Sequence, residues 1–158
     1  MAEEGKMEKA RAALLYGVRI LRPQDRFNII SFAGEEHLME AGLIPADAQG
    51  RARGETFVKK LKPVGGTNIN QSLLASLRQF SETGRERPKM LVFMTDGLPT
   101  VDETNVTKIL DNVRKSIKPG VRLFTFGVGY DVNTALLDKL AAIRIAASIA
   151  MGIGAKLA

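Results

Sequence analysis

The 158-residue sequence contains no cysteine and no tryptophan, and it has a single histidine, His37. The absence of cysteine excludes a disulfide framework and a thiolate metal site, and it is compatible with any cellular compartment. One histidine at the start of an expected strand is more often structural than catalytic. Because no nucleophile-elbow motif is present either, nucleophilic catalysis is disfavoured.

Long apolar runs are also missing. The most apolar stretch, Ile145 to Ala155, is well short of the roughly 20 residues that a spanning helix needs. The first residues are acidic and lead into an amphipathic helix rather than a secretory leader. We therefore expect no transmembrane segment and see no leader in the sequence as given.

The charge is one-sided, with 23 Lys and Arg against 17 Asp and Glu and a formal net charge of +6. Such a surplus weakly favours acidic partners through long-range steering. The basic residues are scattered over expected helix faces and turns without the interleaved aromatics typical of nucleic-acid binding. We expect a solvated surface and no nucleic-acid partner.

Strand and helix patterns alternate along the chain. Hydrophobic spacing predicts helices at about 6–21, 54–61, 69–80, 105–117 and from 134 onward, strands at 26–32, 37–43, 90–94 and 121–127, and a loop at 45–53. This alternation predicts an α/β fold, doubly wound, with a mostly parallel sheet flanked by helices. The pattern predicts one domain over residues 1–141. Residues 142–158 form an atypical apolar tail, for which three interpretations stay open: a longer helix, a packing tail or a mis-read end of the gene.

The segment MLVFMTDGLPT, Met90 to Thr100, places Asp96 directly after a buried strand. Open α/β sheets bind ligands at the carboxyl ends of their strands, so Asp96 is a candidate ligand-binding carboxylate. Gly97 allows a sharp turn and leaves room for a ligand. Asp-Gly is also a common turn pair, so a purely structural role for Asp96 is equally compatible with this segment.

A second segment, KPVGGTNIN, places Gly65 and Gly66 before Thr67, Asn68 and an amphipathic helix. Either Thr67 or Asn68 is a natural helix N-cap. Paired glycines also allow a ligand to approach the backbone, which a cap does not require. A hydroxyl and a carboxylate at the mouth of one sheet are hard oxygen ligands of the kind that Mg²⁺ prefers.

With these two segments in order, the chain resembles the von Willebrand factor type A domain, and most closely the proteins related to inter-alpha-trypsin inhibitor heavy chains. Further matching segments are the helix KMEKARAALLYGVRIL and the strands DRFNIISF and LFTFGVG. The resemblance implies a Rossmann-like fold with a metal-ion-dependent adhesion site that holds Mg²⁺, or Mn²⁺ or Ca²⁺. It also implies that an acidic side chain of a protein partner completes the coordination. The ligands that carry over are Thr67 and Asp96, with Gly65, Gly66, Asn68 and Gly97 as loop residues.

One family motif is missing: no Asp-x-Ser-x-Ser occurs in the sequence. We therefore expect an N-terminally truncated domain without its first strand, an incomplete site, and weak or absent metal binding. The expected function is a non-enzymatic adhesion or protein-interaction module, extracellular or at the cell surface by resemblance only. The alternative is a metal-independent interaction domain. A nucleotide-binding or hydrolytic enzyme is a distant third, since Gly127-Val128-Gly129 lacks the third glycine of a dinucleotide fingerprint.

Overall fold

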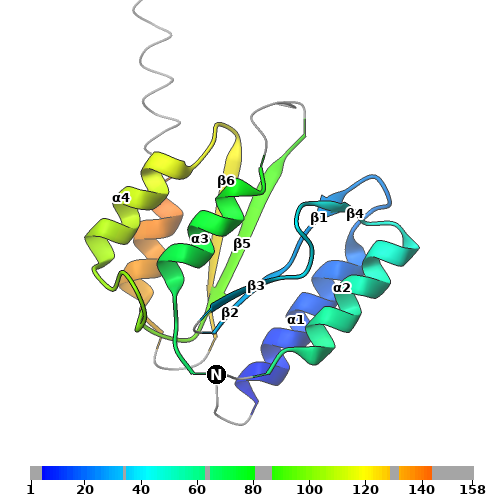
Figure 1. Cartoon of the computed structure of the whole chain (residues 1–158), viewed down its shortest axis with the longest axis horizontal. Helices are drawn as coiled ribbons and strands as arrows, with labels where there is room; N and C mark the ends of the chain where they lie inside the picture. Colours follow the sequence, from blue (N-terminus) through cyan, green and yellow to red (C-terminus); the bar gives the residue numbers. More distant parts are fainter. Residues whose placement is uncertain (1–4, 34, 63–64, 81–86, 129–131, 144–158) are drawn as a thin grey trace, which may run out of the picture.

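The computed structural model describes residues 5–143 apart from 34, 63–64, 81–86 and 129–131 (Figure 1). Its strands and helices alternate as the sequence predicts. The elements in chain order are α1 (Lys6–Ile20), β1 (Arg26–Phe27), β2 (Ile30–Ala33), β3 (Glu35–Leu38), β4 (Ile44–Pro45), α2 (Ala48–Lys60), α3 (Ile69–Arg78), β5 (Lys89–Thr95), α4 (Val106–Ser116) and β6 (Val121–Gly127). A further helix covers residues 134–143.

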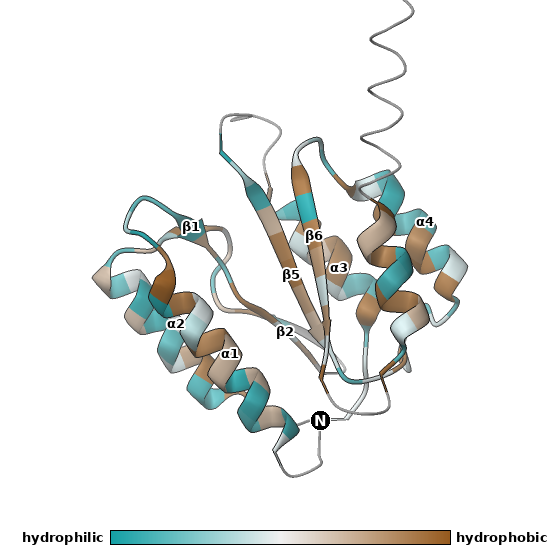
Figure 2. Cartoon of the chain, turned by 180° about the vertical axis from the view of Figure 1, so that it is seen from behind, coloured by the Kyte–Doolittle hydropathy of each residue, from teal (hydrophilic) through white to brown (hydrophobic). Residues whose placement is uncertain are grey.

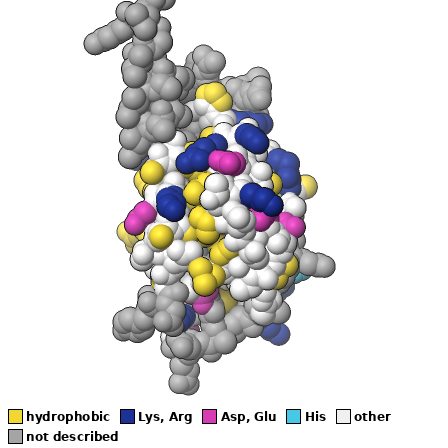
Figure 3. All heavy atoms as spheres, turned by 90° about the vertical axis from the view of Figure 1, so that its left-hand side faces the viewer, with side chains coloured by type: hydrophobic (Ala, Val, Ile, Leu, Met, Phe, Trp, Pro, Cys, Tyr) yellow, Lys and Arg dark blue, Asp and Glu magenta, His cyan; other side chains and the backbone are white. Residues whose placement is uncertain are grey.

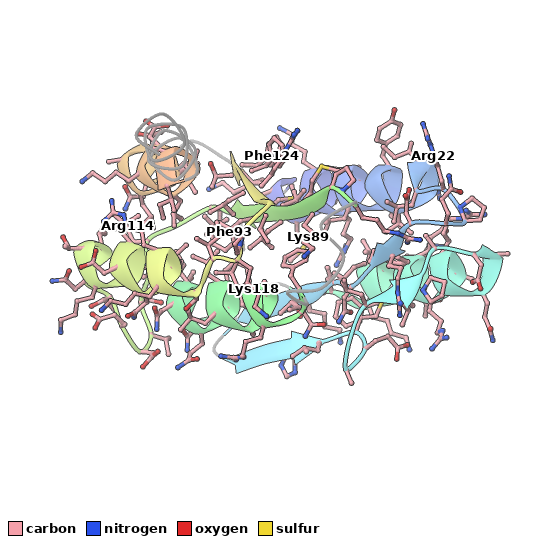
Figure 4. All side chains as sticks on the ribbon, turned by 90° about the horizontal axis from the view of Figure 1, so that it is seen from above. Arg22, Lys89, Phe93, Arg114, Lys118 and Phe124 are labelled. Carbon is pink, nitrogen blue, oxygen red and sulfur yellow. The ribbon has the colours of Figure 1, made fainter. Side chains whose placement is uncertain are left out.

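The parallel part of the fold is the β5–β6 pair, which runs in register from Lys89 opposite Val121 to Thr95 opposite Gly127. α4 connects the two strands, as a parallel pair requires. α3 and α4 lie on one side of this pair when the molecule is seen from above (Figure 4). The result is the helix-flanked α/β architecture that the alternating pattern predicts.

The remaining strands form two antiparallel pairs, β1 with β4 and β2 with β3. By their hydrogen bonds, the described strands are grouped into three two-stranded sheets. β2 and β5 both pack on α3, and the rings of Phe32 and Phe93 stack with centroids 5.2 Å apart, but no ladder joins the two strands.

Three predicted elements have wrong boundaries. The strand expected at 26–32 is divided into β1 and β2, which belong to different pairs. The strand expected at 37–43 is instead β3 and β4, separated by residues 39–43, because the side chain of Asn28 interrupts the ladder there. Its Oδ1 accepts the Glu40 N–H at 3.2 Å, and its Nδ2 donates to the Glu40 carbonyl at 2.7 Å. Residues 48–53, expected to be loop, are the first turns of α2, whose N-cap Asp47 accepts the Gly50 N–H at 2.8 Å.

Other expectations hold. β6 has the predicted bounds, and Asn105 caps α4 by accepting the Lys108 N–H at 3.2 Å. Asn133 caps the 134–143 helix by accepting the Leu136 N–H at 3.1 Å. All but the first two residues of the predicted apolar tail, 144–158, lie outside the described residues.

Apolar packing is uneven between the two faces of the β5–β6 pair. The face toward α3 and α4 contributes Phe93 and Leu123 to the main core, where both are nearly fully buried. The opposite face leaves four large apolar side chains 40–56% exposed: Met90, Val92, Phe124 and Phe126. Figure 2 shows this face from behind, with apolar strand segments that no described helix covers.

Candidate metal site

The loop that carries Asp96 begins where β5 ends. The last residue of the strand, Thr95, is buried, and its carbonyl accepts the Val128 N–H at 2.9 Å. Its hydroxyl accepts a long hydrogen bond, 3.4 Å, from the Gly97 N–H. Asp96 and Gly97 are half-buried. The loops after β5 and β6 are thus tied together at the carboxyl edge of the parallel pair, where the sequence predicts the site.

The loop that carries Thr67 begins the third helix. Asn68 is buried and is the N-cap of α3, because its Oδ1 accepts the Gln71 N–H at 3.1 Å. Of the two candidate caps, Asn68 therefore holds the helix, and the half-buried Thr67 hydroxyl is not used as a cap. Gly66 has a φ of 89°, a conformation that favours glycine. An added Cβ at Gly65 or at Gly97 would meet no atom within 4 Å.

Thr100 joins the two loops. The Thr67 N–H donates to the Thr100 hydroxyl at 2.8 Å, and the Thr100 N–H donates back to the Thr67 carbonyl at 3.0 Å. The Val101 N–H shares the same carbonyl at 3.4 Å. The N–H and the carbonyl of Thr67 are therefore both hydrogen-bonded to the loop that begins at Asp96. Sequence reasoning missed Thr100, because nothing in the spacing of the segment distinguishes it from other loop residues.

The loop continues into the start of α4. Asp102 has a φ of 61°, and Glu103 accepts the Asn105 N–H at 2.9 Å and lies 3.5 Å from Lys108 Nζ. Glu103 therefore anchors the beginning of the helix.

The glycine after the last strand also has a packing role. A Cβ at Gly127 would lie 2.4 Å from a methyl carbon of Val132. Because Gly127 has no side chain, Val132 packs closely against it. This packing explains the glycine without a bound dinucleotide.

The donor set at the loops is limited to hard oxygens, which suit Mg²⁺ and Ca²⁺. Within the described part of the chain, no group of three or more His, Cys, Asp or Glu residues is placed to hold a metal ion. Thr67 and Asp96 fit the chemistry of a magnesium site but supply only part of a six-oxygen coordination shell.

Comparison with known proteins identifies the fold first. A von Willebrand factor type A protein from Catenulispora acidiphila superimposes with a TM-score of 0.77 at 24% identity, covering 89% of this chain and 33% of that chain. Proximal thread matrix protein 1 from the mussel byssus, with a zinc-occupied MIDAS motif, superimposes with a TM-score of 0.65 at 15% identity, covering 88% of this chain and 37% of that chain. Both likenesses define a doubly wound von Willebrand factor type A fold.

Sequence comparison then gives the family. The von Willebrand factor type A domain family matches residues 1–144, and human inter-alpha-trypsin inhibitor heavy chain H4 is 34% identical over 142 residues, which is 86% of this chain. The chain belongs to the von Willebrand factor type A domain family. It spans about 15% of the length of the heavy chains it matches.

Family membership supports an adhesion or protein-interaction module with protein partners. Among the residues that the structure describes, no helix combines the length and apolar character needed to cross a bilayer.

Proposed function

We propose that this domain is a protein-interaction module in which a divalent ion bridges the Thr67 hydroxyl and the Asp96 carboxylate to an acidic side chain of a partner protein. Mg²⁺ is the expected ion, with Mn²⁺ or Ca²⁺ as substitutes. The observation that carries the proposal is the reciprocal hydrogen bonding of Thr67 and Thr100, which fixes one candidate ligand against the loop of the other. The heavy-chain relatives favour an extracellular or cell-surface setting for this role.

Each candidate residue has a distinct part in the proposal. Asp96 supplies the negative charge that holds the ion, and Thr67 supplies a neutral hydroxyl. The glycines Gly65, Gly66 and Gly97 leave the approach open, while Asn68 holds the start of α3. When bound, the ion would supply the positive charge that attracts a partner's carboxylate.

Two ligands are few for an ion that loses its waters reluctantly. We therefore expect this chain to bind Mg²⁺ with a dissociation constant in the millimolar range or weaker, or roughly 4 kcal/mol or less of binding free energy. Addition of an Asp-x-Ser-x-Ser loop in a strand before residue 1 is expected to tighten binding and permit Mg²⁺-dependent attachment to an acidic side chain.

Titration calorimetry tests the site. Asp96→Asn is expected to abolish the weak Mg²⁺ signal, because it removes the charge that holds the ion. The matched control is Asp111→Asn, which removes the same charge from an exposed position on α4 and leaves its partner Arg114 in place. Tight binding by the unmodified chain, or equal binding by Asp96→Asn and the control, would place the ion elsewhere.

The second candidate is an interaction domain that works without metal. It is favoured by the sequence, which contains no Asp-x-Ser-x-Ser, and by the small donor set among the described residues. The two candidates differ in one outcome: if the chain with the added loop also fails to bind Mg²⁺, the metal-free function is favoured.

A further inference from the structure

The β5–β6 pair has one covered face and one bare face. Phe93 and Phe124 point to opposite sides of the pair, and α3 and α4 lie on the side of Phe93 (Figure 4). Side chains alternate between the two faces of a strand, so every second residue belongs to the side of Phe124. We call this side the rear face and define it by six residues: Met90, Val92, Met94, Arg122, Phe124 and Phe126.

The parallel register arranges the rear face in three rows, because Met90 lies beside Arg122, Val92 beside Phe124 and Met94 beside Phe126. The rows are apolar except for Arg122, which lies where both strands begin. Four of the apolar side chains are 40–56% exposed. Parallel strands are usually buried on both faces, and a contiguous exposed apolar patch marks a contact surface. The rear face therefore requires a cover that the described helices do not supply.

The outer surface of α4 is a useful contrast. Cations and anions alternate there, as in the pairs Arg114–Asp111 and Lys108–Glu103, and Figure 3 shows this side of the molecule with both signs of charge. Charged side chains of this kind are well solvated, so this surface needs no cover. Within the described part of the chain, no ion pair involves a residue of the rear face.

The chain itself supplies an apolar segment close to this face. Residues 144–158, which lie outside the described residues, directly follow the 134–143 helix. That helix packs against β6, because the Thr125 hydroxyl donates to the Leu137 carbonyl at 3.2 Å and Ile143 is buried in the core that contains Leu123. The segment therefore starts from a helix that is attached to the strand of Phe124.

The sequence of the segment matches the rear face in character and in length. Its largest aliphatic residues are four positions apart, so a helix would carry them on one side: Ile145, Ile149, Ile153 and Leu157. This stripe would be about 18 Å long as a helix, and strands of seven residues such as β5 and β6 are about 20 Å long. Gly152 and Gly154 lower the intrinsic helix propensity, so such a helix depends on packing for its stability.

Other occupants of the rear face fit less well. A stable interface between two copies buries about 800 Å² on each partner and takes roughly 20–30 residues a side, many more than the rear face offers. A free partner protein must compete with a segment of the same chain, whose effective concentration near the face is roughly millimolar. Both comparisons favour the segment that is already attached.

We propose that residues 144–158 fold back as a helix onto the rear face, with the stripe of Ile145, Ile149, Ile153 and Leu157 against the rings of Phe124 and Phe126. The contact buries apolar surface on both elements and needs no metal. It is independent of the loops that carry Thr67 and Asp96.

Tryptophan fluorescence tests this contact in the full chain, because the sequence contains no tryptophan. Phe124→Trp places one reporter on the rear face, and Tyr16→Trp places another on α1, where the side chain is 68% exposed. Ile149→Asp is expected to raise the acrylamide-quenching constant of the first reporter about threefold, because a charge is costly in an apolar contact and releases the segment. The matched control Ser148→Asp adds the same charge at the neighbouring polar position and should leave both reporters unchanged.

Three outcomes would overturn the proposal. Equal effects of Ile149→Asp and Ser148→Asp would mean that the apolar stripe makes no specific contact. A Phe124→Trp reporter that is fully quenchable before any change to the segment would leave the rear face free for a partner protein. Protection of that reporter that disappears on dilution would assign the face to a second copy of the chain. Circular dichroism checks that each variant is folded.

Cysteine cross-linking gives a second measurement that does not depend on Ile149→Asp, since the sequence contains no cysteine. Val92→Cys combined with Ile149→Cys is expected to form an intramolecular product with a short bismaleimide, detected by mass spectrometry. Lys108→Cys combined with Ile149→Cys is the matched control, because Lys108 is on the outer surface of α4 with its side chain 69% exposed. Equal yields from the two pairs would contradict the proposed contact.

Discussion

The two halves of the molecule are built by different means. Among the described residues, the half that contains α3, β5, α4, β6 and the 134–143 helix shares a core of fourteen buried apolar side chains. On the same basis, the half that contains α1, β1, β4 and α2 has a core of three, Val18, Phe27 and Ala46. Hydrophobic stabilisation is roughly proportional to the apolar area that is buried. The first half is therefore stabilised much more by its core than the second half.

The smaller half relies on close backbone approach and on polar tethers. Gly50 lies so near the Pro45 carbonyl that a Cβ would come within 2.0 Å of its oxygen. Arg51 donates to the Ala46 carbonyl at 2.8 Å, and Arg11 of α1 donates to the Leu61 carbonyl at the end of α2. Because its described apolar core is small, we expect this half to open at a lower free energy than the larger one.

The largest expected effect is in the main core. Leu73→Ala removes a fully buried side chain of α3 and is expected to lower the free energy of unfolding by about 3 kcal/mol, within the usual range for such cavities. Urea denaturation measures it. The control Leu98→Ala removes the same atoms from a side chain that is 58% exposed and should have little effect. A loss below about 1 kcal/mol for Leu73→Ala would contradict the assignment of this core.

The next effect is in the smaller half. Gly50→Ala forces a methyl group against the Pro45 carbonyl and is expected to cost about 2 kcal/mol, because α2 must move away from β4. Hydrogen exchange should show faster opening of α1 and α2 while α3 and β5 are unchanged. The control Gly17→Ala, where a Cβ meets nothing within 4 Å, should instead stabilise α1 by about 0.5–1 kcal/mol. Uniform acceleration across both halves would mean that they unfold as one unit.

A matched pair of helix caps sharpens the comparison further. Asp47→Ala and Asn105→Ala each remove a side-chain acceptor from a helix start and are expected to cost about 1 kcal/mol. The Asn105 variant should show its loss in global unfolding, whereas the Asp47 variant should show it mainly as faster exchange of α2 amides. Identical behaviour of the two variants would remove the distinction between the halves.

The smallest effect concerns an exposed ion pair between α1 and α2. A hydrogen bond from Arg19, 3.2 Å from the carboxylate, lowers the pKa of Glu55 below its ordinary value of 4.5. Because the pKa of Glu55 is lower in the folded state, its interaction with Arg19 stabilises the fold at pH values above the unfolded-state pKa of Glu55. This stabilisation is lost as the pH falls through the folded-state pKa. Arg19→Gln should raise the Glu55 pKa in an NMR titration, whereas Arg53→Gln, which removes the partner of Glu40, should not.

The elements with strong local signals were predictable from sequence. α4 combines apolar residues at helical spacing with an Asn cap, and β6 is a run bounded by glycines, so both were placed within a residue. The candidate loops were also predictable as loops, since Gly-Gly and Asp-Gly mark them. Their mutual contact through Thr100 was not, because that contact joins residues 33 positions apart.

The misplaced elements depend on contacts that sequence spacing does not contain. Residues 48–53 lie in the predicted loop but form the first turns of α2, where a Cβ at Gly50 would meet the Pro45 carbonyl and one at Gly54 would meet the ring of Phe27. Asn28 divides an expected strand by bonding to Glu40, twelve residues away. In each case a tertiary contact overrides the local preference.

The stacking of Phe32 on Phe93 has a mechanical consequence. Among the described residues, no ladder of hydrogen bonds joins β2 to β5, so a force that separates these strands is resisted by this ring contact and by the packing of both strands on α3. An aromatic pair adds about 0.5–1.5 kcal/mol beyond its buried area, far less than a ladder of several bonds loaded in shear. In a protein-interaction module, tension applied across this contact would separate β2 from β5 before the hydrogen-bonded pairs β2–β3 and β5–β6 come apart.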